Sequence, residues 1–247
     1  MDCVIPSHKK DYEVLPHCIN SVREFLGVRN IVIISAERPD CLPSGVIWHQ
    51  EDSVFPFTLK DITDALKPEY VGQAGWYQQQ LIKLYAGTCL EGLSSRYIVV
   101  DSDTIVMRPF LLESDGIPVF STSSEYHVPY FEAMRMLHPD LKKVMPRSAI
   151  AHYMVLDSDV CRQLFSFVED HHGNGMPFWQ LYVQLAADHR NGQSEYETYY
   201  AFHKGVLGLD SVTESYPFEN RKELSSWRSF RGGRNAYVSF HAYHGRI

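Results

Sequence analysis

The stretch Arg96-Tyr-Ile-Val-Val-Asp-Ser-Asp-Thr-Ile-Val-Met-Arg-Pro109 decides how the chain is organised. Its run Ile98-Val-Val100 is β-branched and is bounded by polar residues, which is typical of a strand buried in a sheet. Asp101 and Asp103 follow that run directly. In a strand that continues past Val100, residues two apart point to the same side. Both carboxylates are then expected to face one ligand at the carboxyl end of the sheet.

A pair of carboxylates in this position can bind a hard divalent cation. Mg²⁺ or Mn²⁺ held by one or two carboxylates normally completes its shell with water and substrate phosphates. The hypothesis is therefore an Asp-x-Asp site for a metal-bound nucleotide diphosphate, and the alternative is a polar turn that ends a core strand. The apolar run before Asp101 favours the site, because α/β sheets bind ligands beyond the carboxyl ends of their strands.

The composition is that of an ordinary enzyme. A length of 247 residues fits one large α/β domain, or one domain with a small appendage. No apolar run approaches the roughly 18 residues that cross a bilayer, so no transmembrane segment is expected. Residues 1–6 lack the form of a signal peptide, and a cytoplasmic location is the expectation. The formal net charge of −7 argues against nucleic acid as a partner. Five scattered cysteines argue against a disulfide framework or a zinc site.

The first half of the chain alternates apolar strands with a helical pattern. Strands are predicted over residues 2–6, 30–35 and 46–52, with a helix over 15–26, which together indicate a parallel sheet with crossover connections. No Gly-x-Gly-x-x-Gly and no Gly-x-x-x-x-Gly-Lys-Ser/Thr is present, so a nucleotide would have to be bound by residues outside these two motifs. Pro6-Ser7-His8 at the end of the first strand is one candidate and Asp52 is another. Ordinary loop chemistry explains either equally well.

A helix is predicted over residues 75–86, and it is dense in glutamine and aromatic residues. Trp76, Gln80 and Lys83 fall at i, i+4 and i+7, so they share one helical face. These side chains suit a groove that meets a polar ligand, with Lys83 as a flexible, phosphate-directed charge. The alternative is an exposed helix whose Trp76 packs inward and whose Lys83 is solvated.

The second half adds further elements and candidate residues. Helices are predicted over 129–141, 157–172 and 178–189, and strands over 118–123, 148–157 and 234–244. His152 lies in the middle of the 148–157 run, where a core histidine is the common alternative to a ligand. His241 and His244 are three apart and point to opposite faces of an extended segment. One of them, with His241 the better placed, is a candidate to complete a metal site at Asp103.

Residues 193–202 begin with a helix-start pattern. Ser194 is a predicted N-cap with Glu197 three residues later, a capping-box spacing that explains Glu197 structurally. Glu195 is not needed for that box. It is a candidate general base that activates a sugar hydroxyl.

Five blocks in succession, Asp2 to Asp11, Gly75 to Leu84, Val100 to Thr104, His152 to Met154 and Ser194 to Glu197, resemble the GT-A-type nucleotide-sugar glycosyltransferases. The sequence is most similar to a group of bacterial glycosyltransferase-like proteins found with surface-polysaccharide genes. The resemblance spans nearly the whole chain. It implies a GT-A-like α/β fold in a single domain over 1–247, with a mostly parallel sheet flanked by helices. Residues 1–110 would form the nucleotide- and metal-binding half, and 111–247 the acceptor half with a C-terminal metal-site tail.

The resemblance also implies roles for single residues. Asp101 would contact the ribose or the metal, and Asp103 and His241 would ligate Mn²⁺ or Mg²⁺. Glu195 or Glu197 would match the acidic pair that includes the catalytic base of inverting members. Here a tyrosine separates the two acids where many relatives have them adjacent, so the choice of base stays open, as does an inverting or a retaining outcome.

The function expected from this resemblance is transfer of a sugar from a nucleotide-diphosphate donor, with UDP-sugars favoured, to a glycan or lipid-linked glycan. Surface-polysaccharide synthesis is the expected setting, with peripheral contact at the inner face of a membrane as an option. Two alternatives remain. A sugar nucleotidyltransferase usually has a Gly-rich loop after its first strand, which Pro6-Ser-His-Lys9 lacks. A non-catalytic glycan-binding protein would keep the fold without turnover. Aromatic residues at 13% suit a sugar-binding cleft and equally a tyrosine-rich core.

Overall fold

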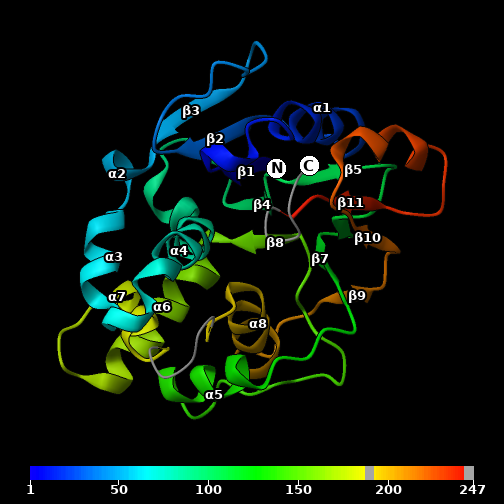
Figure 1. Cartoon of the computed structure of the whole chain (residues 1–247). Helices are drawn as coiled ribbons and strands as arrows, with labels where there is room; N and C mark the ends of the chain where they lie inside the picture. Colours follow the sequence, from blue (N-terminus) through cyan, green and yellow to red (C-terminus); the bar gives the residue numbers. More distant parts are fainter. Residues whose placement is uncertain (187–191, 242–247) are drawn as a thin grey trace.

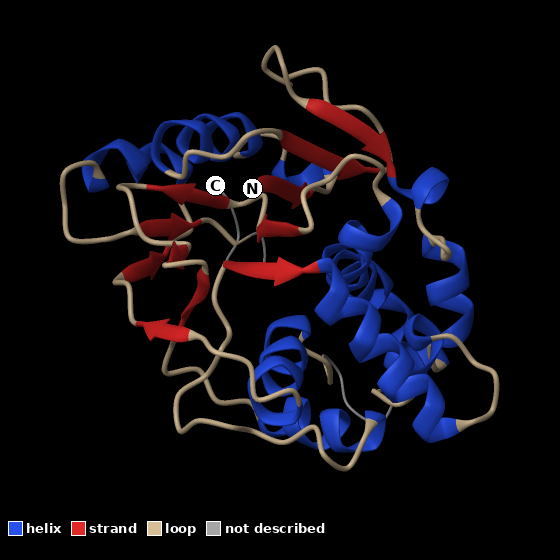
Figure 2. Cartoon of the chain, turned by 180° about the vertical axis from the view of Figure 1, so that it is seen from behind, coloured by secondary structure: helices blue, strands red, loops and turns tan. Residues whose placement is uncertain are grey.

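A five-stranded sheet lies at the centre of the computed structural model, which describes residues 1–186 and 192–241 (Figures 1 and 2). Its strand order is β3-β2-β1-β4-β8. The first four strands are parallel and β8 runs antiparallel to β4. The bounds are Asp2–Pro6 (β1), Ile31–Ser35 (β2), Ile47–Gln50 (β3), Arg96–Val100 (β4) and Tyr153–Asp157 (β8).

The central strands are apolar at successive positions because both faces of the sheet are covered. In β1, Val4 faces the larger core while Ile5 faces the smaller one, and in β4 Val99 and Ile98 divide in the same way. This alternation follows from the two-residue period of a strand. Continuous β-branched runs therefore predict these buried strands well.

Helices pack on both faces of the sheet (Figure 1). The smaller core lies under α1, and the larger core joins the opposite face to α4, α6, α7 and α8. The α-helices are Leu15–Phe25 (α1), Glu51–Val54 (α2), Leu59–Ala65 (α3), Ala74–Cys89 (α4), Val128–Leu137 (α5), Ser158–His172 (α6), Phe178–Gln184 (α7) and Glu195–Tyr200 (α8). Shorter helical segments are Lys9–Asp11 (η1), Pro68–Gln73 (η2), the π-helix Ala201–Val206 (η3) and Leu224–Phe230 (η4).

Two small sheets complete the fold. One has the order β10-β11-β5 and the other β6-β7-β9. Their strands are Thr104–Val106 (β5), Glu113–Ser114 (β6), Ile117–Ser121 (β7), Val212–Glu214 (β9), Phe218–Asn220 (β10) and Tyr237–Ser239 (β11). The antiparallel pair β5–β11 places Ser239 opposite Thr104. This pairing brings the C-terminal part of the chain next to the Asp-x-Asp sequence.

Most elements predicted from the sequence are confirmed, and their ends are the main corrections. The helix predicted over 129–141 ends at Leu137, since Pro139 disfavours the helical conformation at His138. The strand predicted over 148–157 begins only at Tyr153, so His152 precedes the strand. The helix predicted over 178–189 ends at Gln184, and its last predicted residues lie partly outside the described ranges.

Helix α4 approaches β4 and α6 very closely at Gly87. A Cβ atom at this position would lie 2.2 Å from Ser158 Oγ and 2.5 Å from the ring of Tyr97. The Tyr97 hydroxyl donates to the carbonyl of Lys83, 2.9 Å away, on the same helix. Gly87 therefore sets how closely α4, and with it Lys83, lies against the sheet. Among the described residues, every helix is too short or too polar to span a bilayer.

Candidate functional site

The candidate site lies at one edge of the central sheet. Parallel strands β1, β2 and β4 all end there, and antiparallel β8 begins there with Tyr153 opposite Val100. One residue further on, the amide of Asp101 donates to the carbonyl of His152 at 2.9 Å. The residues after β4 and before β8 are therefore held side by side by the sheet itself.

Asp101, Ser102 and Asp103 form a turn between β4 and β5. The amide of Thr104 donates to the carbonyl of Asp101 at 3.0 Å, which closes the turn. The expectation that a continuing strand aligns both carboxylates is therefore wrong. Each carboxylate instead has its own set of partners.

The Asp101 carboxylate is bound by a buried lysine. Lys83 Nζ lies 2.5 Å from Asp101 Oδ1 and 2.6 Å from Glu195 Oε1, and it donates to the Tyr196 hydroxyl at 3.1 Å. The Lys83 side chain is only 1% exposed, whereas that of Asp101 is 22% exposed. Lys83 is thus a fixed bridge between α4, the end of β4 and α8. This burial corrects both the expected flexibility of the phosphate-directed Lys83 charge and the alternative of a solvated Lys83.

Charges in this cluster shift one another's protonation equilibria. Burial alone raises the pKa of Asp101, but the Lys83 ammonium and the hydrogen bond with His152 outweigh it and hold the pKa below the usual range. For Glu195 the effect of burial on the pKa exceeds the opposite effect of the Lys83 charge, so the pKa of Glu195 is raised. Burial lowers the pKa of Lys83, but the charges of Asp101 and Glu195 raise it well above its ordinary value. Lys83 is therefore charged.

Each of the two aspartates has a histidine beside it, and the two histidine rings lie close together. His152 Nδ1 lies 3.3 Å from Asp101 Oδ2, and His241 Nδ1 lies 3.1 Å from Asp103 Oδ2. The two imidazole rings are 4.8 Å apart between centroids. The amide of Phe240 donates to the carbonyl of Asp103 at 2.8 Å, which explains how the tail positions His241. His244 lies outside the described residues.

The donor atoms at this edge fit Mn²⁺ or Mg²⁺ in chemistry. Within residues 1–186 and 192–241, no group of three or more His, Cys, Asp or Glu side chains is already arranged to hold a metal. A site of one or two carboxylates suffices for these cations when substrate phosphates supply the remaining oxygens. Burial alone lowers the pKa of His241, but hydrogen bonding and the charges of Asp103, Asp101 and Asp11 raise it overall. The local field thus favours a cation beside these carboxylates.

The residues that follow β1 lie at the same edge. Ser7 is buried, and its Oγ has no hydrogen-bond partner among the described residues. A buried hydroxyl without a partner is costly, so this atom is suited to a ligand. Pro6 ends β1, while exposed His8 caps η1 by accepting from the amide of Lys10 at 3.3 Å.

Gln80 lies one helical turn from Lys83 on α4 and is committed to internal bonds. Its Oε1 accepts from the Tyr182 hydroxyl at 2.5 Å, and its Nε2 donates to the carbonyl of Gln193 at 3.4 Å. Trp76, one turn earlier still, is half-buried. The shared face predicted for the three residues therefore runs from Lys83 toward the molecular surface.

Glu197 has contacts of a different kind from those of Glu195. Its Oε1 accepts from Ser148 Oγ at 2.7 Å and from the amide of Ala149 at 3.1 Å. Ser194 does cap the amide of Glu197, at 3.3 Å, but the Glu197 carboxylate faces residues 148–149. Its role as a catalytic acid or base stays a prediction, and these contacts favour an anchoring role for α8.

Three residues of the cluster were missed by sequence reasoning. The Tyr196 hydroxyl accepts a hydrogen bond from Lys83 and donates one to Asp101 Oδ1 at 3.3 Å. Ser102 Oγ donates to Asp11 Oδ2 at 2.9 Å. Asp11 is buried although it follows two lysines in a charged segment. Tyr196 carried one usable signal, its position between two acidic residues at a helix start.

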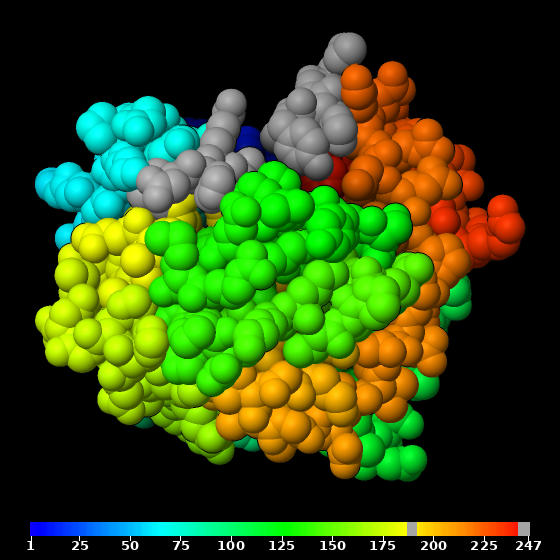
Figure 3. Space-filling view, turned by 90° about the horizontal axis from the view of Figure 1, so that it is seen from below, coloured from blue at the N-terminus to red at the C-terminus, as the bar shows by residue number. Residues whose placement is uncertain are grey.

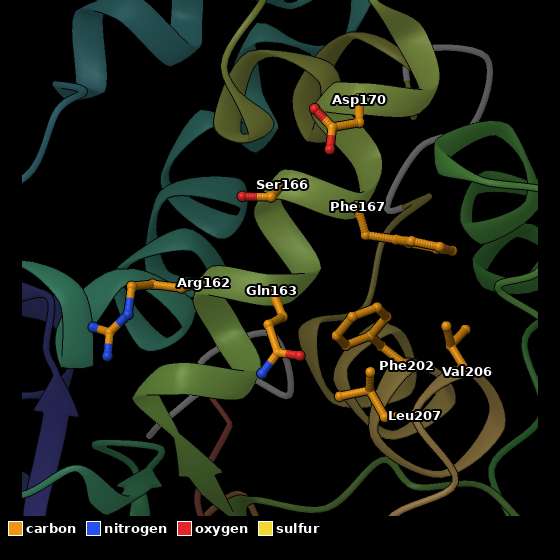
Figure 4. A pocket seen from close by; sticks show the side chains of 8 residues that line it. All are labelled: Arg162, Gln163, Ser166, Phe167, Asp170, Phe202, Val206 and Leu207. Atoms are coloured by element: carbon orange, nitrogen blue, oxygen red, sulfur yellow. The ribbon is translucent and has the colours of Figure 1, made fainter.

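A pocket of about 390 Å³ lies apart from this cluster, between α6 and η3 (Figure 4). Phe167, Phe202, Val206 and Leu207 gather on its apolar side, while Arg162 points away from them. None of the cluster's residues lines it. We assign it no part in the site.

Comparisons with known proteins bear on the fold. A family model described as a family of unknown function, DUF6492, matches residues 28–223. No curated protein matches the sequence. An active-site mutant of LgtC superposes with a TM-score of 0.50 at 10% identity, covering 97% of this chain and 87% of that one. The α/β fold with a mostly parallel central sheet is thus that of the GT-A glycosyltransferases.

Two further solved structures are similar at slightly lower scores. The galactosyltransferase LgtC, in complex with donor and acceptor sugar analogs, gives a TM-score of 0.49 at 11% identity and covers 97% and 87% of the two chains. Mouse xyloside xylosyltransferase 1, in its apo form, gives 0.48 at 14% identity and covers 98% and 99%.

Proposed function

The chain belongs to the DUF6492 family of unknown function, and for this member we propose a metal-dependent glycosyltransferase that uses a nucleotide-sugar donor. One observation carries the proposal. At the carboxyl edge of the sheet, Lys83 and Tyr196 contact Asp101, Lys83 also binds Glu195, and His241 contacts Asp103. A GT-A fold makes such an edge a donor site by analogy of fold.

Mn²⁺ or Mg²⁺ would be held by Asp101, Asp103 and His241. The bound cation would supply positive charge that stabilises the leaving nucleoside diphosphate. The chain's part is to orient the ligands. Lys83 fixes one oxygen of Asp101, so the other, Oδ2, is left beside His152 and the site. The β5–β11 pair fixes Asp103 and His241 relative to each other.

In this proposal Glu195 lies nearest the sugar. Its buried carboxylate is held by Lys83 and its raised pKa brings it closer to the range useful for proton transfer. Lys83 contacts Glu195 Oε1, so the proton of the acceptor hydroxyl would pass to the other carboxylate oxygen, Oε2. A retaining transfer needs no such base, and there Glu195 and Lys83 would position the sugar. Glu197 anchors α8 and thereby positions Glu195.

The proposed donor, acceptor and location are those that the sequence resemblance to GT-A glycosyltransferases implies. Residues 1–110 would hold the nucleotide and metal, with Pro6-Ser7-His8 near the nucleoside and His152 beside the diphosphate. Residues 111–247 would hold the acceptor and supply the metal-site tail, all within one domain. The donor would be a UDP-sugar, and the acceptor a glycan or lipid-linked glycan of a surface polysaccharide. Work at the cytoplasmic face of a membrane would follow from a lipid-linked acceptor.

Nucleotide release from a panel of donors tests the proposal. UDP-glucose, UDP-galactose, UDP-N-acetylglucosamine and GDP-mannose are each incubated with the protein and Mn²⁺. We expect one donor class to be hydrolysed slowly, with activity lost in EDTA and in Asp103→Asn. Asp115→Asn, the same change at an exposed carboxylate, is the matched control and should behave as the native chain. No turnover by folded native protein, or equal turnover in Asp103→Asn, contradicts the proposal.

A further inference from the structure

A buried side-chain hydrogen bond holds the turn between β4 and β5, residues 101–104. Ser102 Oγ donates to Asp11 Oδ2 at 2.9 Å, across 91 positions of the chain. Ser102 is 5% exposed and Asp11 is 6% exposed. The N-terminal segment that carries Asp11 appears in Figure 3 only as a small dark-blue area at the upper edge of the face. Because solvent has little access to this bond, water does not readily replace either partner.

Ser102 lies between the two carboxylates of the proposed metal site. Lys83 contacts Asp101 through Oδ1, and His241 contacts Asp103 through Oδ2. Each of these contacts orients one carboxylate. The distance between the two carboxylates depends on the backbone of the turn, and therefore on where Ser102 is held. A hydrogen bond at Ser102 can thus set the spacing of the pair without any contact with the cation.

Asp11 is itself held in place by the backbone on both sides. Its amide donates to the carbonyl of His8 at 2.7 Å, and its carbonyl accepts from the amide of Val14 at 2.9 Å. It ends η1, in the segment that joins β1 to α1. The same segment begins with Ser7, whose buried Oγ has no hydrogen-bond partner among the described residues. The Asp11–Ser102 bond therefore connects the residues after β1, where the nucleoside is proposed to lie, with the turn after β4.

We propose that Asp11 is a positioning residue of the metal site, which fixes the spacing of Asp101 and Asp103 through Ser102 and does not itself bind the cation. The inference rests on the proposed function, because it concerns the cation of that same site. It adds a residue that lies outside the Asp-x-Asp sequence. Removing a polar group that orients metal ligands from behind typically lowers metal affinity by about 10- to 100-fold.

The affinity for Mn²⁺, measured by calorimetric titration of the full chain in the presence of UDP, tests the inference. We expect Ser102→Ala to weaken Mn²⁺ binding about tenfold and Asp11→Ala to weaken it at least as much. The double variant should bind Mn²⁺ as Asp11→Ala does, since two residues that act through one bond have effects that do not add. The electron paramagnetic resonance spectrum of the bound Mn²⁺ should change in the same variants, because the ligand geometry changes.

Ser21→Ala is the matched control. Ser21 is also a buried serine, and its Oγ accepts from the amide of Val106, on β5, at 2.9 Å. Its removal should lower the thermal midpoint and leave the Mn²⁺ affinity of the folded protein unchanged. An equal loss of affinity in Ser21→Ala would show that general destabilisation causes the effect, which contradicts a positioning role. If Asp11→Ala does not fold, Ser102→Ala decides alone, because it removes the same bond with the loss of one hydroxyl group.

The outcomes separate this inference from the proposed function. If the native protein binds Mn²⁺ with UDP and Ser102→Ala binds it equally well, the positioning role is overturned and the transferase proposal stands. A loss of affinity in Asp11→Ala with native affinity in Ser102→Ala would make Asp11 a ligand of the cation, which also contradicts the inference. A native protein that binds neither UDP nor Mn²⁺ contradicts the transferase proposal, and the inference with it.

Discussion

Lys83 Nζ lies 2.6 Å from Glu195 Oε1, although the two residues are 112 positions apart in the chain. The same ammonium group lies 2.5 Å from Asp101. One buried charge therefore ties together three segments that carry the proposed chemistry.

Lys83→Met should be strongly destabilising. The substitution keeps the volume but leaves the buried carboxylate of Glu195 and the partly buried one of Asp101 without their counter-charge. Breaking a buried ion pair in this way costs about 3–5 kcal/mol. Urea unfolding measures the change. Lys60→Met removes an exposed ion pair with Asp64 and should cost less than about 1 kcal/mol. Equal effects of the two substitutions would contradict the role of Lys83 as a buried bridge.

The substitutions Glu195→Gln and Glu197→Gln should distinguish a catalytic role of Glu195 from an anchoring role of Glu197. Glu195→Gln should lower transfer by about 10²-fold or more, if the carboxylate takes the acceptor's proton, with little change in nucleotide affinity. Glu197→Gln weakens the bonds to Ser148 and Ala149 and should cost about 1–2 kcal/mol of stability with near-native turnover. Initial rates and thermal unfolding are compared on both variants. A larger loss of turnover in Glu197→Gln would reverse the two roles.

Gly87→Ala should destabilise the fold, because the added Cβ meets Ser158 and Tyr97 at 2.2 and 2.5 Å. Overpacking of this kind costs about 1–3 kcal/mol. Gly75→Ala, in the same helix with no atom within 4 Å, is the matched control. It should be neutral or should stabilise by about 0.5–1 kcal/mol, since alanine favours a helix over glycine. A thermal midpoint unchanged in Gly87→Ala would show that α4 is less closely packed than described.

More of the fold than of the site could be predicted from the sequence. Strands such as β1 and β4 are predicted because their continuous β-branched runs have no other stable environment. Asp101, Asp103 and His241 are predicted as site residues by position and resemblance. The turn at Asp101 is decided by one local hydrogen bond, from Thr104. A run of residues does not reveal that bond.

Long-range partners account for the rest. The burial of Lys83 depends on where α8 packs, and a helical face that reads as polar gives no sign of two carboxylates far along the chain. Glu195 and Glu197 both lie in the first turn of α8. Their different contacts therefore also depend on tertiary neighbours. Sequence spacing identifies such candidates but does not divide the roles between them.

His203 should make the stability of the fold depend on pH. Burial, together with the nearby charges of Lys204 and Arg96, lowers the pKa of His203 from 6.5 to about 4. Between these pH values the unfolded chain binds more protons than the folded one, so stability falls as the pH drops from 6.5 toward 4. His203→Leu should make the free energy of unfolding less dependent on pH in that window. An unchanged pH dependence in urea titrations would show that His203 does not cause it.

The central claim is that a nucleoside diphosphate binds at Asp101 and Asp103 through a divalent cation. Calorimetric titration of UDP, GDP and CMP into the native protein and Asp103→Ala, with and without Mn²⁺, tests it most directly. We predict that one nucleotide, UDP on the present account, binds the native protein only with Mn²⁺ and that Asp103→Ala abolishes the binding. Binding that needs no metal, or no binding of any nucleotide, would contradict the claim.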